Sequence, residues 1–215
     1  MSEVEKIPVF DIGDTLVPAH DKINEKVQEE LRNEGVEDAP ELPINEYNIY
    51  KPSEIEAWLE KHGIEAEAEA LKQAYLNWVY EFLREQVVEE LKSINEDFGP
   101  IGFISDNSFA AKKFYRKLFE EEDLQYEGFV VSEEAGAEKP HREIFEAFIE
   151  ERSEDADRFV YFGNYVDRDK AAEKEGMHFV WDDRYHVFNS SFEGPTIHKL
   201  TYETVKEALK EVGSK

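Results

Sequence analysis

Short apolar runs that alternate with charged, amphipathic segments constrain the fold of this chain more than any other feature. After residue 100, the runs PIGFI, YEGFVV, DRFVYFG and HFVWDD are each followed by a segment with helical character, and the last of these segments covers residues 201–213. Short apolar runs with few charges are typical of strands buried on both faces. Helices between such strands form right-handed crossovers in a parallel sheet. We therefore predict an α/β fold.

One strand stands apart from the others, near the N-terminus. Residues 7–12 form an apolar run, whereas residues from about 20 to 95 are strongly charged and helical in pattern. The proline-punctuated segment 39–52 divides this region, and residues 65–94 read as a long helix that is interrupted once. We predict a core domain formed by residues 1–17 and 99–215, with an all-helical domain of residues 18–98 inserted after the first strand.

The chain is intensely acidic, with a formal net charge of −26 and 35% charged residues. Hydrophobic residues nevertheless make up 40% of the sequence, which favours a folded protein over a disordered one. Two explanations of the acidity remain open. One is adaptation to a cytosol of very high salt, where screening weakens the repulsion between carboxylates. The other is an acidic protein without such adaptation.

Several function classes are disfavoured by composition. Nucleic-acid binding requires clusters of lysine and arginine, which are not found here. The sequence contains no cysteine, so disulfides, thiolate metal sites and cysteine nucleophiles are excluded. No apolar run approaches the length of a membrane span, and the acidic N-terminal segment lacks the apolar stretch of a signal peptide. We expect a cytoplasmic protein that binds neither membranes nor nucleic acids.

Reactive side chains follow the predicted strands at the points where the strands end. In an open α/β sheet, ligands bind at the carboxyl ends of the strands. Such a set would supply a carboxylate nucleophile, a lysine that neutralises the charge of a phosphate, and oxygen ligands for a hard cation. The residues at these positions are Asp11, Ser105, Asp106, Lys139, Asn164, Asp167 and Asp169.

Four motifs around these residues resemble those of the haloacid dehalogenase-like (HAD) hydrolase superfamily. They read DIGDT at residues 11–15, FISDN at 103–107, EKP at 138–140 and GNYVDRD at 163–169. The family pattern is D-x-D-x-T, then a serine or threonine at a strand end, then a lysine, and finally an acidic cluster. All four occur in family order, and the helical insertion occupies the place of a C1-type cap. The resemblance covers essentially the whole chain and implies a Rossmann-like HAD core.

The resemblance implies a role for each catalytic position. Asp11 corresponds to the nucleophile that forms an aspartyl-phosphate, and Thr15 corresponds to the residue that orients its loop. Ser105 corresponds to the hydroxyl that binds the transferring group, and Lys139 to the cation that neutralises the charge of that group. The implied activity is a phosphomonoesterase that acts on a small phosphorylated metabolite.

The resemblance also implies a Mg²⁺ ion as cofactor. Its ligands would be Asp11, the backbone carbonyl of Gly13 and the fourth-motif side chains Asn164 and Asp169, with Asp167 as the fallback. The family usually has an aspartate where this chain has Asn164. An amide oxygen can bind Mg²⁺ but brings no negative charge. We therefore expect weakened metal affinity.

The first motif departs from the family pattern at one position. The family's second aspartate protonates the leaving group and later activates water, but Gly13 stands at that position here. Asp14 lies one residue further on and is a secondary candidate for the same role. General acid–base catalysis contributes about 10²–10⁴ in rate, so its loss would slow hydrolysis without abolishing it.

These departures leave two alternative functions open. The dehalogenase branch of the superfamily needs no metal, and it has an asparagine followed three residues later by an aspartate, as Asn164 and Asp167 do. Against this alternative, Asp106 would repel a halide and a carboxylate substrate. Asn107, which follows it, is a further secondary candidate for the site. The other alternative is a catalytically impaired HAD-fold protein that only binds its ligand.

The halophile hypothesis predicts that stability rises with salt. Repulsion among the 51 acidic residues is screened beyond about 10 Å at 0.1 M ionic strength and about 3 Å at 1 M. The melting temperature, measured from low to multimolar KCl, should therefore increase. A flat or falling curve would remove the halophile explanation.

Overall fold

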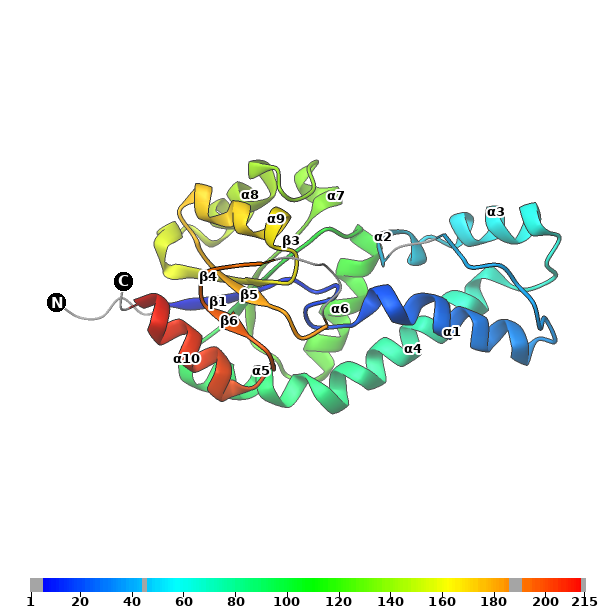
Figure 1. Cartoon of the computed structure of the whole chain (residues 1–215), viewed down its shortest axis with the longest axis horizontal. Helices are drawn as coiled ribbons and strands as arrows, with labels where there is room; N and C mark the ends of the chain where they lie inside the picture. Colours follow the sequence, from blue (N-terminus) through cyan, green and yellow to red (C-terminus); the bar gives the residue numbers. More distant parts are fainter. Residues whose placement is uncertain (1–5, 44–45, 186–190, 214–215) are drawn as a thin grey trace.

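A computed structural model describes residues 6–43, 46–185 and 191–213 of the chain, and its centre is a six-stranded sheet (Figure 1). The strands pair in the order β3-β2-β1-β4-β5-β6, and every pair is parallel. Their bounds are β1 Ile7–Phe10, β2 Ile101–Ser105, β3 Tyr126–Val131, β4 Phe159–Gly163, β5 His178–Asp182 and β6 Thr196–Ile197.

The strand order reverses direction at β1, which lies between β2 and β4. The loops that leave the carboxyl ends of these strands separate there, and this point of an α/β sheet is where ligands bind. The loop that contains Asp11 follows β1 directly. The predicted α/β fold with a parallel, Rossmann-like sheet is confirmed.

Helices cover both faces of the sheet. In Figure 1, α8 and α9 lie on one side of the strands, whereas α5 and α10 lie on the other. The helices that follow the insertion are α5 Val88–Phe98, α6 Phe109–Glu121, α7 Ser132–Ala135, α8 Arg142–Arg152, α9 Val166–Asp169 and α10 Tyr202–Gly213. Two 3₁₀ turns, η1 Ala156–Arg158 and η2 Lys170–Glu175, complete the connections.

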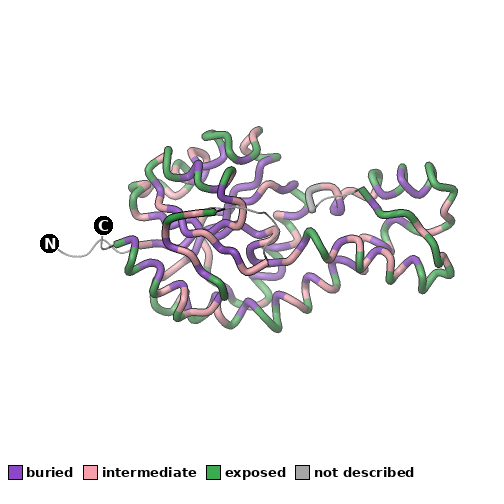
Figure 2. Tube along the Cα trace, in the orientation of Figure 1, coloured by how far each residue is buried: buried purple, intermediate pink, exposed green. Residues whose placement is uncertain are grey.

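Strand residues alternate between two hydrophobic clusters, one on each face of the sheet. Val9 and Tyr161 belong to the cluster beneath α8, whereas Phe10 and Phe162 belong to the larger cluster that also contains side chains of α5, α6 and α10. This alternation follows from the two-residue repeat of a strand. All four residues of β1 are buried, as are all five residues of β4, and Figure 2 shows this continuous buried centre. The sheet therefore gives the loops at its carboxyl edge a rigid support.

The predicted helical region between β1 and β2 forms α1 Ala19–Asn33, α2 Glu46–Ile49, α3 Pro52–His62 and α4 Ala68–Gln86. In Figure 1, α1, α3 and the first part of α4 extend away from the sheet. The long predicted helix is interrupted at Val87, which separates α4 from α5. Because α5 packs against β2 and α10, the exact limits of the expected cap domain, 18–98, stay a prediction. No helix of the described residues is long and apolar enough to cross a membrane.

Candidate active site

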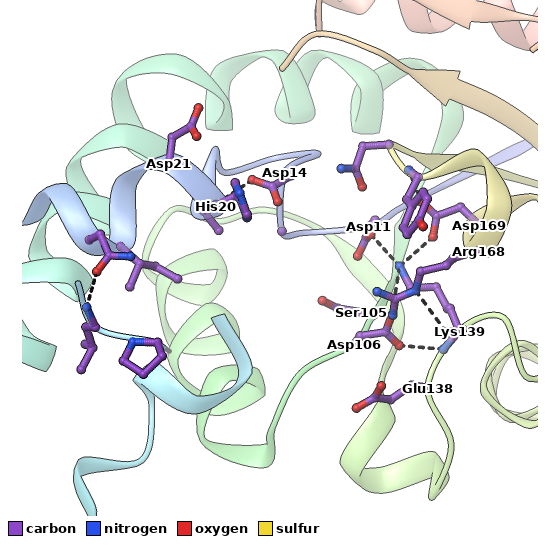
Figure 3. Close-up of a pocket in the computed structure, with 18 of the residues that line it drawn as sticks. Asp11, Asp14, His20, Asp21, Ser105, Asp106, Glu138, Lys139, Arg168 and Asp169 are labelled. Atoms are coloured by element: carbon purple, nitrogen blue, oxygen red, sulfur yellow. Dashed lines mark hydrogen bonds and ion pairs between the residues drawn. The ribbon is translucent and has the colours of Figure 1, made fainter. Parts of the chain in front are cut away.

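A cleft of about 860 Å³ lies between the carboxyl edge of the sheet and the beginning of the helical insertion. Figure 3 shows its side chains. The residues that line its sheet side include Asp11, Ser105, Asp106, Lys139, Asn164 and Asp169. The opposite wall comes from α1 and the loop that follows it, and it includes His20, Asp21, Asn24, Glu41, Leu42 and Pro43. Strand ends that are far apart in the sequence therefore meet in one cavity.

The side chain of Lys139 is the centre of the sheet side, and it is only 2% exposed. Its ammonium nitrogen donates to Asp11 Oδ2 at 2.6 Å and to the hydroxyl of Tyr161 at 2.9 Å. It also lies 2.9 Å from Asp169 Oδ1 in an ion pair. Tyr161 in turn donates to the carbonyl of Ile104. The ammonium group therefore lies against two carboxylates and one hydroxyl oxygen, and it donates hydrogen bonds to Asp11 and Tyr161.

For both Asp11 and Lys139, burial and the paired opposite charges shift the pKa in opposite directions. Burial raises the pKa of Asp11 to about 7, and the nearby Asp169 carboxylate acts in the same direction, although Lys139 opposes both. Burial alone would lower the pKa of Lys139, but Asp11 and Asp169 outweigh it and raise that pKa well above its usual value. Lys139 is therefore a permanent cation that partly neutralises two buried carboxyls.

A second ion pair holds the backbone of Lys139. Asp106 Oδ1 accepts from the Lys139 N–H at 2.8 Å, and Asp106 Oδ2 accepts from the guanidinium of Arg168. The same guanidinium donates through Nε to the Lys139 carbonyl at 3.1 Å. Both polar backbone groups of Lys139 are thus bound to one Asp–Arg pair, and this pair fixes the direction in which the lysine enters the cleft.

Of the two fourth-motif acids, Asp169 lies in the cleft and Asp167 does not. Asp169 is buried, and its Oδ2 accepts from the backbone N–H of Tyr165 at 2.8 Å. Its carboxylate packs over Gly163, where an added Cβ would come within 2.5 Å of it. Asp167 is exposed and does not line the cleft. The glycine that ends β4 therefore makes room for the buried acid.

The first motif forms a tight loop that turns Asp14 away from Asp11. Asp14 has a left-handed backbone with φ of 53°, which aspartate tolerates better than most residues. Its Oδ1 accepts from the backbone N–H of His20 at 2.8 Å, so it caps the beginning of α1. Burial raises the pKa of this carboxyl, and its hydrogen bond with His20 opposes the shift. Figure 3 shows Asp14 and His20 together, apart from the Lys139 cluster.

The remaining predicted residues are arranged around this centre. The buried hydroxyl of Thr15 donates to Asn164 Oδ1 at 3.5 Å, which links the first and fourth motifs. Ser105 ends β2 and lines the cleft. Asn107 is buried and does not line the cleft, and its Oδ1 accepts from the N–H of Ser108. The structure therefore brings Asn164 and Ser105 to the cleft but not Asn107.

Three contributors were not predicted from the sequence. Tyr161 and Arg168 contact Lys139 as described, and Arg184 joins the carboxylate of Asp182 to the carbonyl of Thr15. Tyr161 lies inside an apolar strand, and the two arginines lie in charged stretches that read as solvated surface. A search for basic residues beside the fourth-motif acids would have found Arg168.

The oxygen donors of the cleft suit a hard cation such as Mg²⁺. Asp11, Asp169 and Asn164 supply side-chain oxygens next to Gly13. Asp169 Oδ1 is buried and has no hydrogen-bond donor among the described residues, although it is ion-paired to Lys139. No group of three or more histidines or acids in the described part of the chain could hold a metal. The possible oxygen donors in the cleft are therefore the carboxylates of Asp11 and Asp169 and the amide oxygen of Asn164.

Comparison with known proteins identifies the fold. No protein-family profile and no curated protein sequence matches the chain. Among solved structures, it is similar to a HAD phosphatase from Thermococcus onnurineus, with 19% identity and a TM-score of 0.60 over 96% of this chain and 98% of that chain. It is also similar to an L-2-haloacid dehalogenase, with 14% identity and a TM-score of 0.62 over 94% and 98%.

A third similar structure is that of YfnB from Bacillus subtilis, which was determined with bound magnesium. The two chains share 17% identity and a TM-score of 0.57 over 95% of this chain and 98% of that one. The chain therefore has the HAD-like fold, and the predicted resemblance is confirmed at that level. The cap subgroup stays a prediction.

The Asp106–Arg168 pair generates a prediction about stability. Asp106→Ala leaves the guanidinium and the Lys139 N–H without their acceptor, so we expect the free energy of unfolding to fall by about 1–3 kcal/mol. Asp167→Ala is the matched control, because Asp167 is a nearby exposed carboxylate, and its effect should stay within about 0.5 kcal/mol. Denaturant unfolding of both variants measures this. Equal effects would show that the pair does not stabilise the loop.

Proposed function

We propose that the protein is a HAD-like hydrolase, and specifically a Mg²⁺-dependent phosphomonoesterase that acts on a small phosphorylated metabolite. The observation that carries this proposal is the buried contact between Asp11 and Lys139 on the sheet side of the cleft. A carboxylate nucleophile and a fixed cation stand side by side there, next to the hydroxyl of Ser105. The similarity to HAD phosphatases supports the proposal through the fold alone.

In the proposed reaction, the Asp11 carboxylate attacks the phosphorus atom of the substrate. A bond forms between the carboxylate oxygen and phosphorus, and the bond between phosphorus and the alcohol oxygen breaks, with the electron pair leaving on that oxygen. Water then attacks the aspartyl-phosphate, which releases inorganic phosphate and restores Asp11. Lys139 and Ser105 stabilise the charge on the phosphoryl oxygens, and Thr15 maintains the loop of the nucleophile.

The charge of the cluster explains why a divalent cation is part of the proposal. Three carboxylates, those of Asp11, Asp106 and Asp169, face two cations, Lys139 and Arg168. A phosphate dianion would be repelled by this net negative charge. Asp11, Gly13, Asn164 and Asp169 would hold Mg²⁺, which supplies positive charge for the phosphoryl oxygens and keeps the Asp11 carboxyl ionised.

The conformation of the first loop supports slow hydrolysis of poor leaving groups. Gly13 has no side chain to donate a proton, and Asp14 uses one carboxylate oxygen to cap α1. Protonation of the leaving group therefore depends on water. Aryl phosphates, whose leaving groups need little protonation, should be turned over faster than alkyl phosphates.

The second candidate is a metal-independent haloacid dehalogenase, which Asn164 and the fold similarity favour. Against it, Arg168, the arginine of the described cleft lining, is paired with Asp106, so it is not available for a substrate carboxylate. Halide release from 2-chloropropionate without added metal would select this function. A catalytically impaired binding protein would bind phosphate esters tightly without turnover.

Asp11 should be indispensable for either reaction. Asp11→Asn preserves the size of the side chain and removes the nucleophile, so we expect less than a few per cent of the activity on p-nitrophenyl phosphate with Mg²⁺, by analogy with the loss of other nucleophiles. Asp167→Asn, outside the cleft, serves as the matched control and should retain its activity. If purified Asp11→Asn kept substantial turnover, both the site and the mechanism would be wrong.

The first loop yields a second prediction on activity. Gly13→Asp should restore a proton donor and increase turnover of alkyl phosphates relative to p-nitrophenyl phosphate, because an alkoxide gains most from protonation. Asp14→Asn should cost less than about tenfold, since its amide oxygen can still cap α1. Steady-state kinetics on both substrates test this. Loss of alkyl phosphate turnover alone in Asp14→Asn would instead identify Asp14 as the general acid.

A further inference from the structure

A hydroxyl group lies inside the apolar centre of the sheet, on β4. It belongs to Tyr161, which is fully buried in the same hydrophobic cluster as Ile104 and Phe145. The Phe145 ring packs edge-on against the Tyr161 ring, with 5.7 Å between the ring centroids. A phenylalanine would make the same apolar contacts, whereas a buried hydroxyl costs free energy unless it is hydrogen-bonded. The apolar packing of β4 therefore does not account for this hydroxyl.

The hydroxyl of Tyr161 joins β4 to β2 across β1, which lies between these two strands in the sheet. It donates to the carbonyl of Ile104 at 3.1 Å and accepts from the ammonium group of Lys139 at 2.9 Å. Ile104 directly precedes Ser105 at the end of β2. Because a hydroxyl has a single proton and this one is donated to Ile104, it presents a lone pair to Lys139. Tyr161 thus links the lysine to the strand end that carries Ser105.

Tyr161 is a neutral neighbour of Lys139, in contrast to the acids around the same ammonium group. The carboxylates of Asp11 and Asp169 are paired with it, and that of Asp106 lies 3.9 Å away. Burial raises the pKa of Tyr161 well above its usual value, and the Asp11 carboxylate acts in the same direction, so the hydroxyl stays protonated. A neutral acceptor holds the ammonium group in place without adding a further negative charge beside it.

We propose that Tyr161 is a positioning residue, which holds the Lys139 ammonium group and Ser105 at the separation that the transition state of phosphoryl transfer requires. This inference rests on the proposed phosphatase function, in which both groups contact phosphoryl oxygens. Tyr161 is not among the residues that line the cleft, so it acts through Lys139 and the backbone of β2. A displaced lysine costs most in the transition state, where preorganised charge contributes most to the rate.

The first test removes the hydroxyl and keeps the ring. In Tyr161→Phe, with p-nitrophenyl phosphate and Mg²⁺, we expect kcat to fall about tenfold, which is less than the removal of a preorganised donor itself costs. KM should change by less than about twofold, because ground-state binding is retained. Tyr115→Phe is the matched control, since Tyr115 is an equally buried tyrosine on α6 that does not line the cleft. The control should retain its kcat and KM.

Two inhibitors separate positioning from a purely structural role. Orthovanadate takes up a five-coordinate geometry similar to the transition state, whereas inorganic phosphate is tetrahedral. In Tyr161→Phe, the inhibition constant of orthovanadate should rise about tenfold and that of phosphate less than about twofold. A hydroxyl that only stabilises the fold would lower the free energy of unfolding when removed, and it would leave the ratio of the two constants unchanged. Denaturant unfolding of Tyr161→Phe and Tyr115→Phe completes the comparison.

The outcomes distinguish this inference from the function on which it rests. If the unmodified protein turns over no phosphomonoester, p-nitrophenyl phosphate included, the proposed function is wrong and the inference falls with it. If it hydrolyses p-nitrophenyl phosphate and Tyr161→Phe keeps its kcat, the function stands and the inference is overturned. Equal weakening of both inhibitors, or an equal loss of kcat in Tyr115→Phe, would also overturn it. So would failure of Tyr161→Phe to fold, because the hydroxyl would then serve the fold itself.

Discussion

The buried ammonium group of Lys139 is the constraint on which the rest of the site depends. A charge removed from water is costly unless it is paired and hydrogen-bonded, and replacing a buried ion pair by apolar residues is often neutral or stabilising. The cluster around Lys139 is therefore weak evidence for stability and better explained by function. Once the lysine is buried, Asp11, Asp169 and the hydroxyl of Tyr161 must all face it. Three segments that are distant in the sequence, those that contain Asp11, Lys139 and residues 161–169, are thereby held at one point.

Much of this arrangement was predictable because parallel strands end at a common edge. Asp11, Ser105 and Asn164 lie directly after β1, at the end of β2 and after β4, so a correct strand assignment was sufficient to bring them together. The helical insertion was also visible as a change of period. In contrast, β6 is two residues long and, among the described strands, pairs with β5 at the edge of the sheet, so its sequence is too short to show a period.

The contacts within the site were less predictable, because they depend on local backbone geometry. Asp167 and Asp169 are two residues apart in the short helix α9, so they point in different directions, and only the structure shows that Asp169 is the buried one. The spacing of the motif permits either aspartate to be the buried one. Arg168 stands between them as one more charge in a charged stretch, yet it is the residue that reaches Asp106 and the Lys139 carbonyl.

The salt bridge between Asp106 and Arg168 changes how the two candidate reactions, phosphate ester hydrolysis and dehalogenation, compare. From the sequence, its carboxylate was expected to repel a halide or a carboxylate substrate, which disfavoured dehalogenation. In the structure, Arg168 neutralises that carboxylate, so its charge alone no longer decides the matter. The same contact, however, occupies the arginine that could otherwise have bound a substrate carboxylate. The proposal of phosphate esters over haloacids therefore rests on the lack of a free arginine for a substrate carboxylate, and no longer on repulsion by Asp106. A bound divalent ion would supply positive charge where the phosphoryl group needs it.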